Sequence, residues 1–89
     1  MTLEFVTEYL DEKIDNNKEY VVCPVYDLRV NHGVLQQEVD EFLKYAKIRL
    51  ENLGYQVYFT GAKFKYKDKT RIVTDNFYLI AIKELEREV

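Results

Sequence analysis

Residues 34–54, VLQQEVDEFLKYAKIRLENLG, are the stretch that decides the fold. Apolar side chains recur in it at steps of three or four residues, a spacing that predicts one apolar face on a helix. These positions are Leu35, Val39, Phe42, Ala46, Leu50 and Leu53. Acidic residues precede basic ones along the stretch, in the order that the helix dipole favours. Gly54 suits the left-handed position that ends a helix, so the segment is predicted to be a long helix that stops there.

The composition indicates one small folded domain over residues 1–89. Hydrophobic residues make up 47% of the chain and aromatic residues 15%, which excludes a disordered chain. The net charge of −3 argues against nucleic-acid binding by the whole surface but permits a local basic patch. Cys23 is the single cysteine, so no intramolecular disulfide can form and a reducing, cytoplasmic location is expected. The sequence shows neither a signal-peptide pattern nor the ~20 apolar residues of a membrane span.

Two elements are expected before the long helix. Residues 3–15 carry an apolar stripe opposite an acidic face, which predicts a first helix with Thr2 as its N-cap. Residues 20–28 are dense in β-formers and predict a strand. Pro24 lies within it and cannot donate to a ladder, so this strand is expected at a sheet edge or bent at that point.

Two strands and a hairpin are expected after the long helix. Residues 55–60 alternate as a strand does, and Gly61 then shifts the phase, which predicts a bulge or sharp bend at Thr60–Gly61. The chain is expected to reverse at Asp68–Lys69 and return over residues 71–74. Residues 77–83 are apolar on both faces, a pattern typical of a central strand covered on both sides.

The predicted fold class is α+β, a two-layer sandwich of two helices packed on a three-stranded, mostly antiparallel sheet. The element order is α-β-α-β-β. A right-handed crossover through the long helix would make the first two strands parallel, with the last strand between them. This is a split β-α-β arrangement of strand order 1-3-2, followed by a charged tail at residues 84–89.

Two helices cover only one face of such a sheet, so the other face is expected to be an exposed, tyrosine-rich patch. Exposed apolar patches of several hundred Å² usually bind a partner. Two partners are expected here: a second copy of the chain, in a homodimer, and another protein. The alternative is that the first helix crosses over and closes the core. The candidate partner-binding residues are Tyr20, Tyr26, Tyr58, Tyr78 and Ile80.

A basic hairpin over residues 63–71 is the second candidate surface. Its cations occupy odd positions only, which on an extended chain would place them on one face. They are Lys63, Lys65, Lys67, Lys69 and Arg71. A cationic ribbon suits phosphate contacts, although Phe64 and Tyr66 alternate away from the lysines and are expected to face the core. The alternative is that the lysines block edge-to-edge aggregation of an exposed hairpin.

A third candidate site lies between the first strand and the long helix. Asp27, Arg29 and His32 there supply a carboxylate, an anion clamp and a titratable base. One histidine and one cysteine make no nitrogen and sulfur cluster for a metal, the chain has no serine for nucleophilic catalysis, and no cofactor is expected.

These observations favour binding over catalysis. The first hypothesis is a small intracellular protein–protein interaction module, adaptor-like or inhibitor-like, that acts as a homodimer. The second is a nucleic-acid-binding module that uses the basic hairpin. The third is a small enzyme with its site at Asp27, Arg29 and His32.

Overall fold

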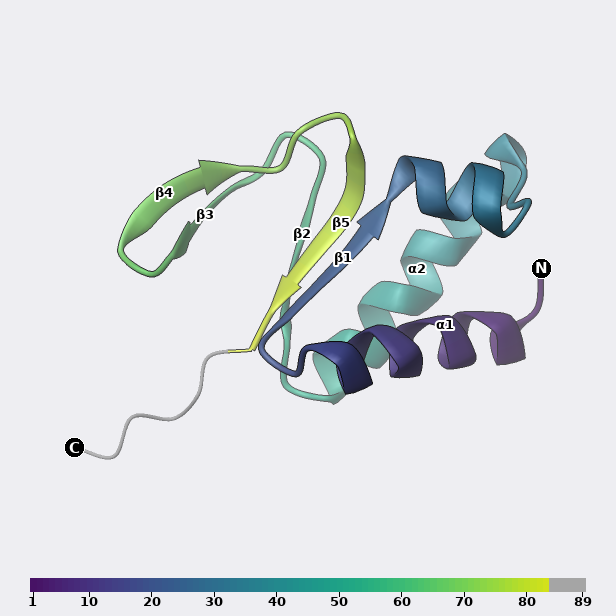
Figure 1. The fold of residues 1–89 in the computed structure, drawn as a ribbon, viewed down its shortest axis with the longest axis horizontal. Helices are drawn as coiled ribbons and strands as arrows, with labels where there is room; N and C mark the ends of the chain where they lie inside the picture. Colours follow the sequence, from purple (N-terminus) through teal and green to yellow (C-terminus); the bar gives the residue numbers. More distant parts are fainter. Residues whose placement is uncertain (84–89) are drawn as a thin grey trace.

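The computed structural model describes residues 1–83, and the charged tail predicted for residues 84–89 lies outside this part of the chain. It has two long helices, a short π-helix (η1) and five strands (Figure 1). In chain order they are α1 (Leu3–Asn16), β1 (Tyr20–Pro24), η1 (Asp27–Asn31), α2 (Gln36–Asn52), β2 (Gln56–Phe59), β3 (Lys63–Tyr66), β4 (Lys69–Ile72) and β5 (Phe77–Ile82). The α+β class is confirmed.

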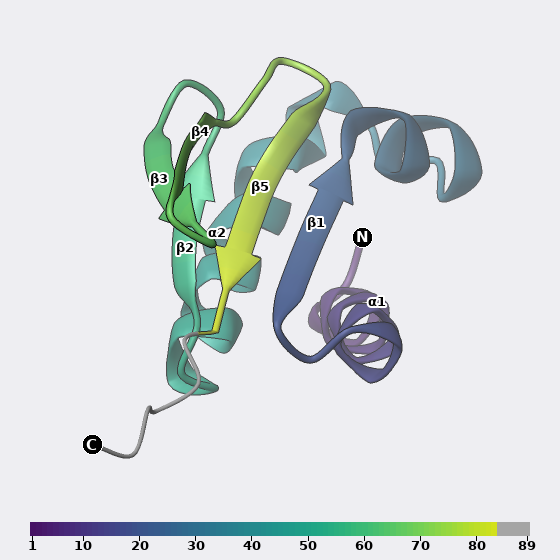
Figure 2. The same ribbon diagram turned by 60° about the vertical axis from the view of Figure 1, so that its left-hand side comes forward.

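The main sheet has the predicted strand order, β1-β5-β2, with β5 antiparallel to both neighbours. Both long helices cover the same face of this sheet (Figures 1 and 2). The helix-side core contains the buried α2 residues Val39, Phe42, Ala46 and Leu50 together with Leu79 of β5. The split β-α-β arrangement is therefore confirmed.

Local sequence signals set the N-terminus of α1 and the C-terminus of α2, as expected. Thr2 caps α1, because its Oγ1 accepts a hydrogen bond from the backbone N–H of Phe5 at 3.1 Å. Gly54 has a φ of +95° and follows the C-terminus of α2, which lets the backbone N–H of Tyr55 donate to the Leu50 carbonyl at 2.9 Å. The prediction of the long helix and its glycine end is confirmed.

The second face of the sheet is covered, and it is covered by the hairpin of β3 and β4. Phe64 and Val73 from the hairpin segment form a second core with Ile80 and Ile82 of β5. The Phe64 ring stacks on Tyr58 with centroids 5.3 Å apart. The expectation of an open tyrosine-rich face is therefore wrong, and so is the alternative in which the first helix closes it.

Two tight turns direct the hairpin onto the sheet. At the first, Gly61 adopts a φ of +91° and the Ala62 N–H donates to the Phe59 carbonyl at 2.9 Å, in agreement with the predicted bend. At the second, Lys67 and Asp68 have φ values of 52° and 64°, which is the left-handed pair of a two-residue hairpin turn. The chain thus reverses one residue earlier than expected.

A β-bulge in β5 changes which side chains face each layer. Cys23 pairs with Leu79 but Pro24 pairs with Phe77, so Tyr78 is an extra residue in the ladder. Phe77 consequently packs with the hairpin-side core and Tyr78 with the helix-side core. The placement of Tyr78 on the same face as Ile80 was wrong for this reason.

The first strand is shorter than predicted. It ends at Pro24, where the ladder is irregular, and residues 27–31 continue as the π-helix η1 instead of extended chain. Short π-helices occur mainly as single turns, frequently at functional sites. This turn brings the Asp27 side chain into contact with α1.

Replacing Phe64 with alanine tests whether the hairpin completes the core. The ring is buried, so Phe64→Ala should lower the free energy of unfolding by about 3–5 kcal/mol. Urea unfolding followed by circular dichroism measures this loss. Lys65→Ala, at the exposed neighbouring position, should change stability by less than about 0.5 kcal/mol. Equal stability of the two variants would show that the hairpin does not pack on the sheet.

Candidate functional site

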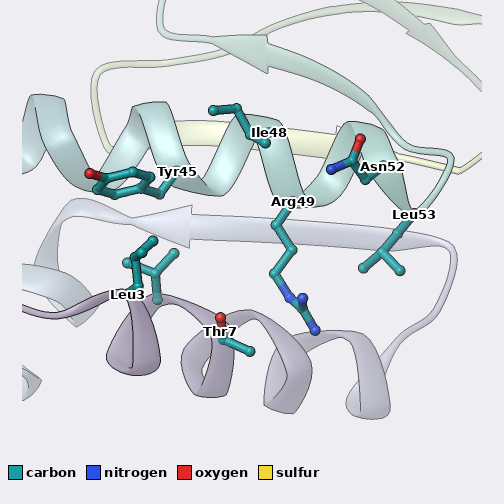
Figure 3. A pocket seen from close by; sticks show the side chains of 8 residues that line it. Leu3, Thr7, Tyr45, Ile48, Arg49, Asn52 and Leu53 are labelled. Atoms are coloured by element: carbon teal, nitrogen blue, oxygen red, sulfur yellow. The ribbon is translucent and has the colours of Figure 1, made fainter.

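A shallow apolar pocket of about 230 Å³ lies between α1 and α2 (Figure 3). We call it the α1–α2 groove. Leu3, Val6 and Thr7 of α1 line one wall, and α2 with the residue after it lines the other. The lining residues from that second wall are Tyr45, Ile48, Arg49, Asn52 and Leu53.

The apolar walls of the groove are unusually open to solvent. Leu3 is 58% exposed, Ile48 49% and Leu53 41%. Burying such side chains against a partner releases roughly 25 cal/mol per Å² of apolar area. A cluster of half-exposed aliphatic residues around a hollow therefore favours occupancy by an apolar group.

Charges flank the groove unequally. Arg49 lies at the groove and its Nη2 donates to Asp11 Oδ1 of α1 at 2.7 Å. Glu4 and Glu8, one turn apart on α1 and next in sequence to Leu3 and Thr7 of the wall, are exposed. Among residues 1–83, none of the ion pairs includes Glu4 or Glu8. Glu4 and Glu8 therefore put negative charge on the solvent-exposed face of α1 beyond the groove wall, whereas the charged residue that lines the groove itself is Arg49.

The five residues predicted to bind a partner do not form one surface. Tyr20, Tyr58 and Ile80 pack with the hairpin-side core, and Ile80 is only 4% exposed. Tyr78 packs with the helix-side core. Tyr26 lies after β1 and is 67% exposed, apart from the other four. The hairpin covers the sheet face on which these residues were expected to form an exposed surface.

The cations of the hairpin are divided between its two faces. Lys63 pairs with Ile72 and Lys65 with Thr70, so these four residues share the outer face. Arg71 and Lys69 pair with Phe64 and Tyr66 and share the opposite face. Their placement on one face was wrong, because a two-residue turn joins odd positions of one strand to even positions of the next.

All five cations nevertheless remain exposed. Lys67 lies at the turn, with its Nζ 5.3 Å from the centroid of the Tyr66 ring. None of the ion pairs found within residues 1–83 involves these cations. Since residues 60–74 carry +4 and the whole chain −3, the rest of the chain carries −7. Residues 84–89 account for −2 of this charge, so the other residues that the structure describes carry −5 against the +4 of residues 60–74.

The third candidate site is a polar cluster centred on Asp27. Its Oδ2 accepts a hydrogen bond from the Tyr9 hydroxyl at 2.6 Å and lies 3.2 Å from Lys13 Nζ. Its Oδ1 accepts a hydrogen bond from Asn31 Nδ2 at 2.9 Å and lies 3.9 Å from His32 Nε2. The cluster ties α1 to the π-helix η1.

Electrostatics hold Asp27 in its charged form. Partial burial alone would raise the pKa of the Asp27 carboxyl, but hydrogen bonds from Tyr9, Asn31 and Lys13 outweigh it and lower the pKa from 3.8 to about 2. Burial, followed by the hydrogen bond to Asp27, raises the pKa of the Tyr9 hydroxyl well above its ordinary value. The pair is thus a phenol bound to a carboxylate throughout the physiological range.

Arg29 is not part of the Asp27 cluster, although the sequence predicted a site that combines Asp27, Arg29 and His32. Its guanidinium donates to Gln36 Oε1 at the start of α2. His32 does approach Asp27, and its ring lies edge-on to Tyr9 with centroids 5.2 Å apart. Because the partners of Asp27 all come from the chain itself, the geometry favours a structural role for this carboxylate.

Sequence reasoning missed Tyr9 and Lys13 of the Asp27 cluster and the lining of the α1–α2 groove. Tyr9 and Lys13 are one turn apart on α1, which places both on one face of that helix. Lys13 interrupts an otherwise acidic helix, and that signal could have indicated a buried acidic partner. Leu3 and Ile48 belong to two different helices and no local pattern joins them.

Cys23 is fully buried, and burial raises the pKa of its thiol to about 12. Within residues 1–83, no group of three or more histidine, cysteine and carboxylate side chains could hold a metal ion. In the same part of the chain, neither helix combines the length and apolarity needed to cross a bilayer.

Comparison of the chain with protein-family models, with curated proteins and with solved structures found no match.

The low pKa of Asp27 predicts a specific loss of stability in acid. The folded chain binds fewer protons at Asp27 than the unfolded chain between about pH 4 and about pH 2, so the contribution of Asp27 is complete above about pH 4 and lost as the pH falls through about 2. Asp27→Asn should therefore be less stable than wild type at neutral pH, by about 1–3 kcal/mol, with the difference shrinking in acid.

Urea unfolding over a pH series measures this difference, and Asp75→Asn, at an exposed position, is the matched control that should follow wild type at every pH. A constant difference between Asp27→Asn and wild type across the series would contradict the assignment of the low pKa to Asp27.

Proposed function

We propose that this domain is a protein-binding module whose α1–α2 groove receives a short segment of a partner protein. One observation carries the proposal: half-exposed Leu3, Ile48 and Leu53 surround a pocket of about 230 Å³. Pockets of this kind bind apolar anchor residues, with polar contacts at the rim supplying specificity.

The charges beside the groove define the chemistry of the partner. Glu4 and Glu8 follow Leu3 and Thr7 of the wall in sequence and lie on the exposed acidic face of α1, which continues along the helix with Glu12 and Asp15. A segment with an aliphatic side chain flanked by lysine or arginine complements both the apolar lining of the groove and the acidic face of α1 beside it. A segment flanked by glutamate would place like charges side by side.

Two labelled peptides of twelve residues test this proposal. Each carries a central leucine, flanked by lysines in one and by glutamates in the other. Fluorescence anisotropy should show that the lysine peptide binds at least about threefold more tightly, because exposed ion pairs contribute about 0.2–1 kcal/mol each. Ile48→Glu should abolish binding, since it places a charge in the apolar wall.

The matched control is Val30→Glu, a similar change at an aliphatic residue that is 61% exposed but lies outside the groove. This variant should bind the lysine peptide as wild type does. Circular dichroism of both variants separates loss of binding from loss of fold. Failure of wild type to bind either peptide, or unchanged binding by Ile48→Glu, would contradict the proposal.

Nucleic-acid binding through the hairpin is the second candidate function. It is favoured by five exposed cations on one hairpin. It is weakened by the −7 charge of the rest of the chain and by Phe64 and Tyr66, which pack inward instead of offering rings to bases. Salt-sensitive binding of a labelled mixed-sequence oligonucleotide, lost when Lys63, Lys65 and Lys67 are replaced by glutamine, would establish this function instead.

A further inference from the structure

The outer face of the β3–β4 hairpin has the chemistry that the α1–α2 groove is proposed to select. Ile72 is 53% exposed there and pairs directly with Lys63. Lys65 is two residues further along the same strand face. An exposed aliphatic side chain of β4 thus lies beside two lysines of β3 on the outer face of the hairpin.

The spacing of the charges matches across the two surfaces. Glu4 and Glu8 are four residues apart on α1, which corresponds to about 6 Å along a helix. Lys63 and Lys65 are two residues apart on β3, which corresponds to about 6.7 Å along a strand. The two acids and the two lysines are therefore in register when strand and helix lie side by side.

We propose that the outer face of the hairpin of one copy docks into the α1–α2 groove of a second copy, with Ile72 entering beside Leu3 and Ile48. Lys63 and Lys65 then pair with Glu4 and Glu8 of the other copy. This inference rests on the proposed function, because it names a second copy of the chain as the groove's partner. Charge complementarity, −5 over the other described residues against +4 over residues 60–74, is the force that orients the encounter.

The geometry of the monomer determines how the copies assemble. The helices and the hairpin lie on opposite sides of the main sheet (Figures 1 and 2). The pocket lies between the two helices, and the hairpin's outer face is turned away from the sheet, so the two surfaces point in different directions. Such a contact is head-to-tail and does not close into a symmetric dimer, so assemblies grow with protein concentration.

A charge exchange between two variants tests the contact. Lys63→Glu with Lys65→Glu reverses the hairpin, and Glu4→Lys with Glu8→Lys reverses the helix. Sedimentation equilibrium at low salt should show wild type rising above its 10.7 kDa monomer mass with concentration. Each double variant alone should reach the same average mass only at a severalfold higher concentration. An equimolar mixture of the two variants should associate again, because each reversed hairpin meets a reversed helix.

Lys67→Glu with Lys69→Glu is the matched control, because it changes the same charge on the same hairpin outside the outer face. Lys63→Glu with Lys65→Glu should weaken association by about threefold to tenfold or more. The control variant should weaken association less than that. Raising the salt from 0.1 M to 1 M shortens the Debye length from about 10 Å to about 3 Å and should dissociate wild type.

Three results would overturn the inference: a monomeric wild type at every concentration, association of the Lys63 and Lys65 variant like wild type, or no recovery in the mixture. The lysine peptide separates this failure from failure of the proposed function. If wild type is monomeric but its groove binds that peptide, the partner is another protein. If the groove binds neither, both the inference and the proposed function are wrong.

Discussion

The whole structure depends on burying both faces of β5. Leu79 and Ala81 point to the helix side, whereas Ile80 and Ile82 point to the other side, and all four are buried. A strand of this kind cannot lie at an edge or face solvent, because each exposed aliphatic side chain would forfeit about 1.5–3 kcal/mol of burial. Two helices supply one cover and the β3–β4 hairpin supplies the other. The molecule is thus a sheet packed between two unlike layers.

This arrangement determines which surfaces remain for binding. The hairpin uses Phe64 and Tyr66 to cover the sheet, so its lysine-bearing outer face is turned to solvent. The helices use their inner stripes for the core and leave the α1–α2 groove on their far side. The basic and acidic parts of the chain therefore lie on opposite sides of the sheet. Charge segregation of this kind directs the orientation of encounters more than it adds to their affinity.

The Asp27 cluster shows how a small protein can hold a partly buried charge. A carboxylate removed from water is costly unless hydrogen bonds and a cation replace its hydration. Tyr9, Asn31 and Lys13 do so here, at distances of 2.6, 2.9 and 3.2 Å. These contacts join α1 to the π-helix after β1. They therefore help to hold α1 against the sheet. The cluster supports the α1–α2 groove by holding one of its two walls.

The sequence by itself determined what depends on local periodicity and turn chemistry. Spacing and turn residues within single segments predicted three features: the long helix that ends before Gly54, the cap at Thr2 and the central place of residues 77–83. The strand order 1-3-2 followed when the right-handed crossover rule was added. Only the tertiary structure decided that the hairpin covers the sheet, that the hairpin's cations divide between two faces and that α1 and α2 enclose a groove. These features arise from a two-residue turn, a bulge in β5 and contacts between residues far apart in the chain. Periodicity carries no information on such contacts, because it records which side of a segment is apolar and not what covers it.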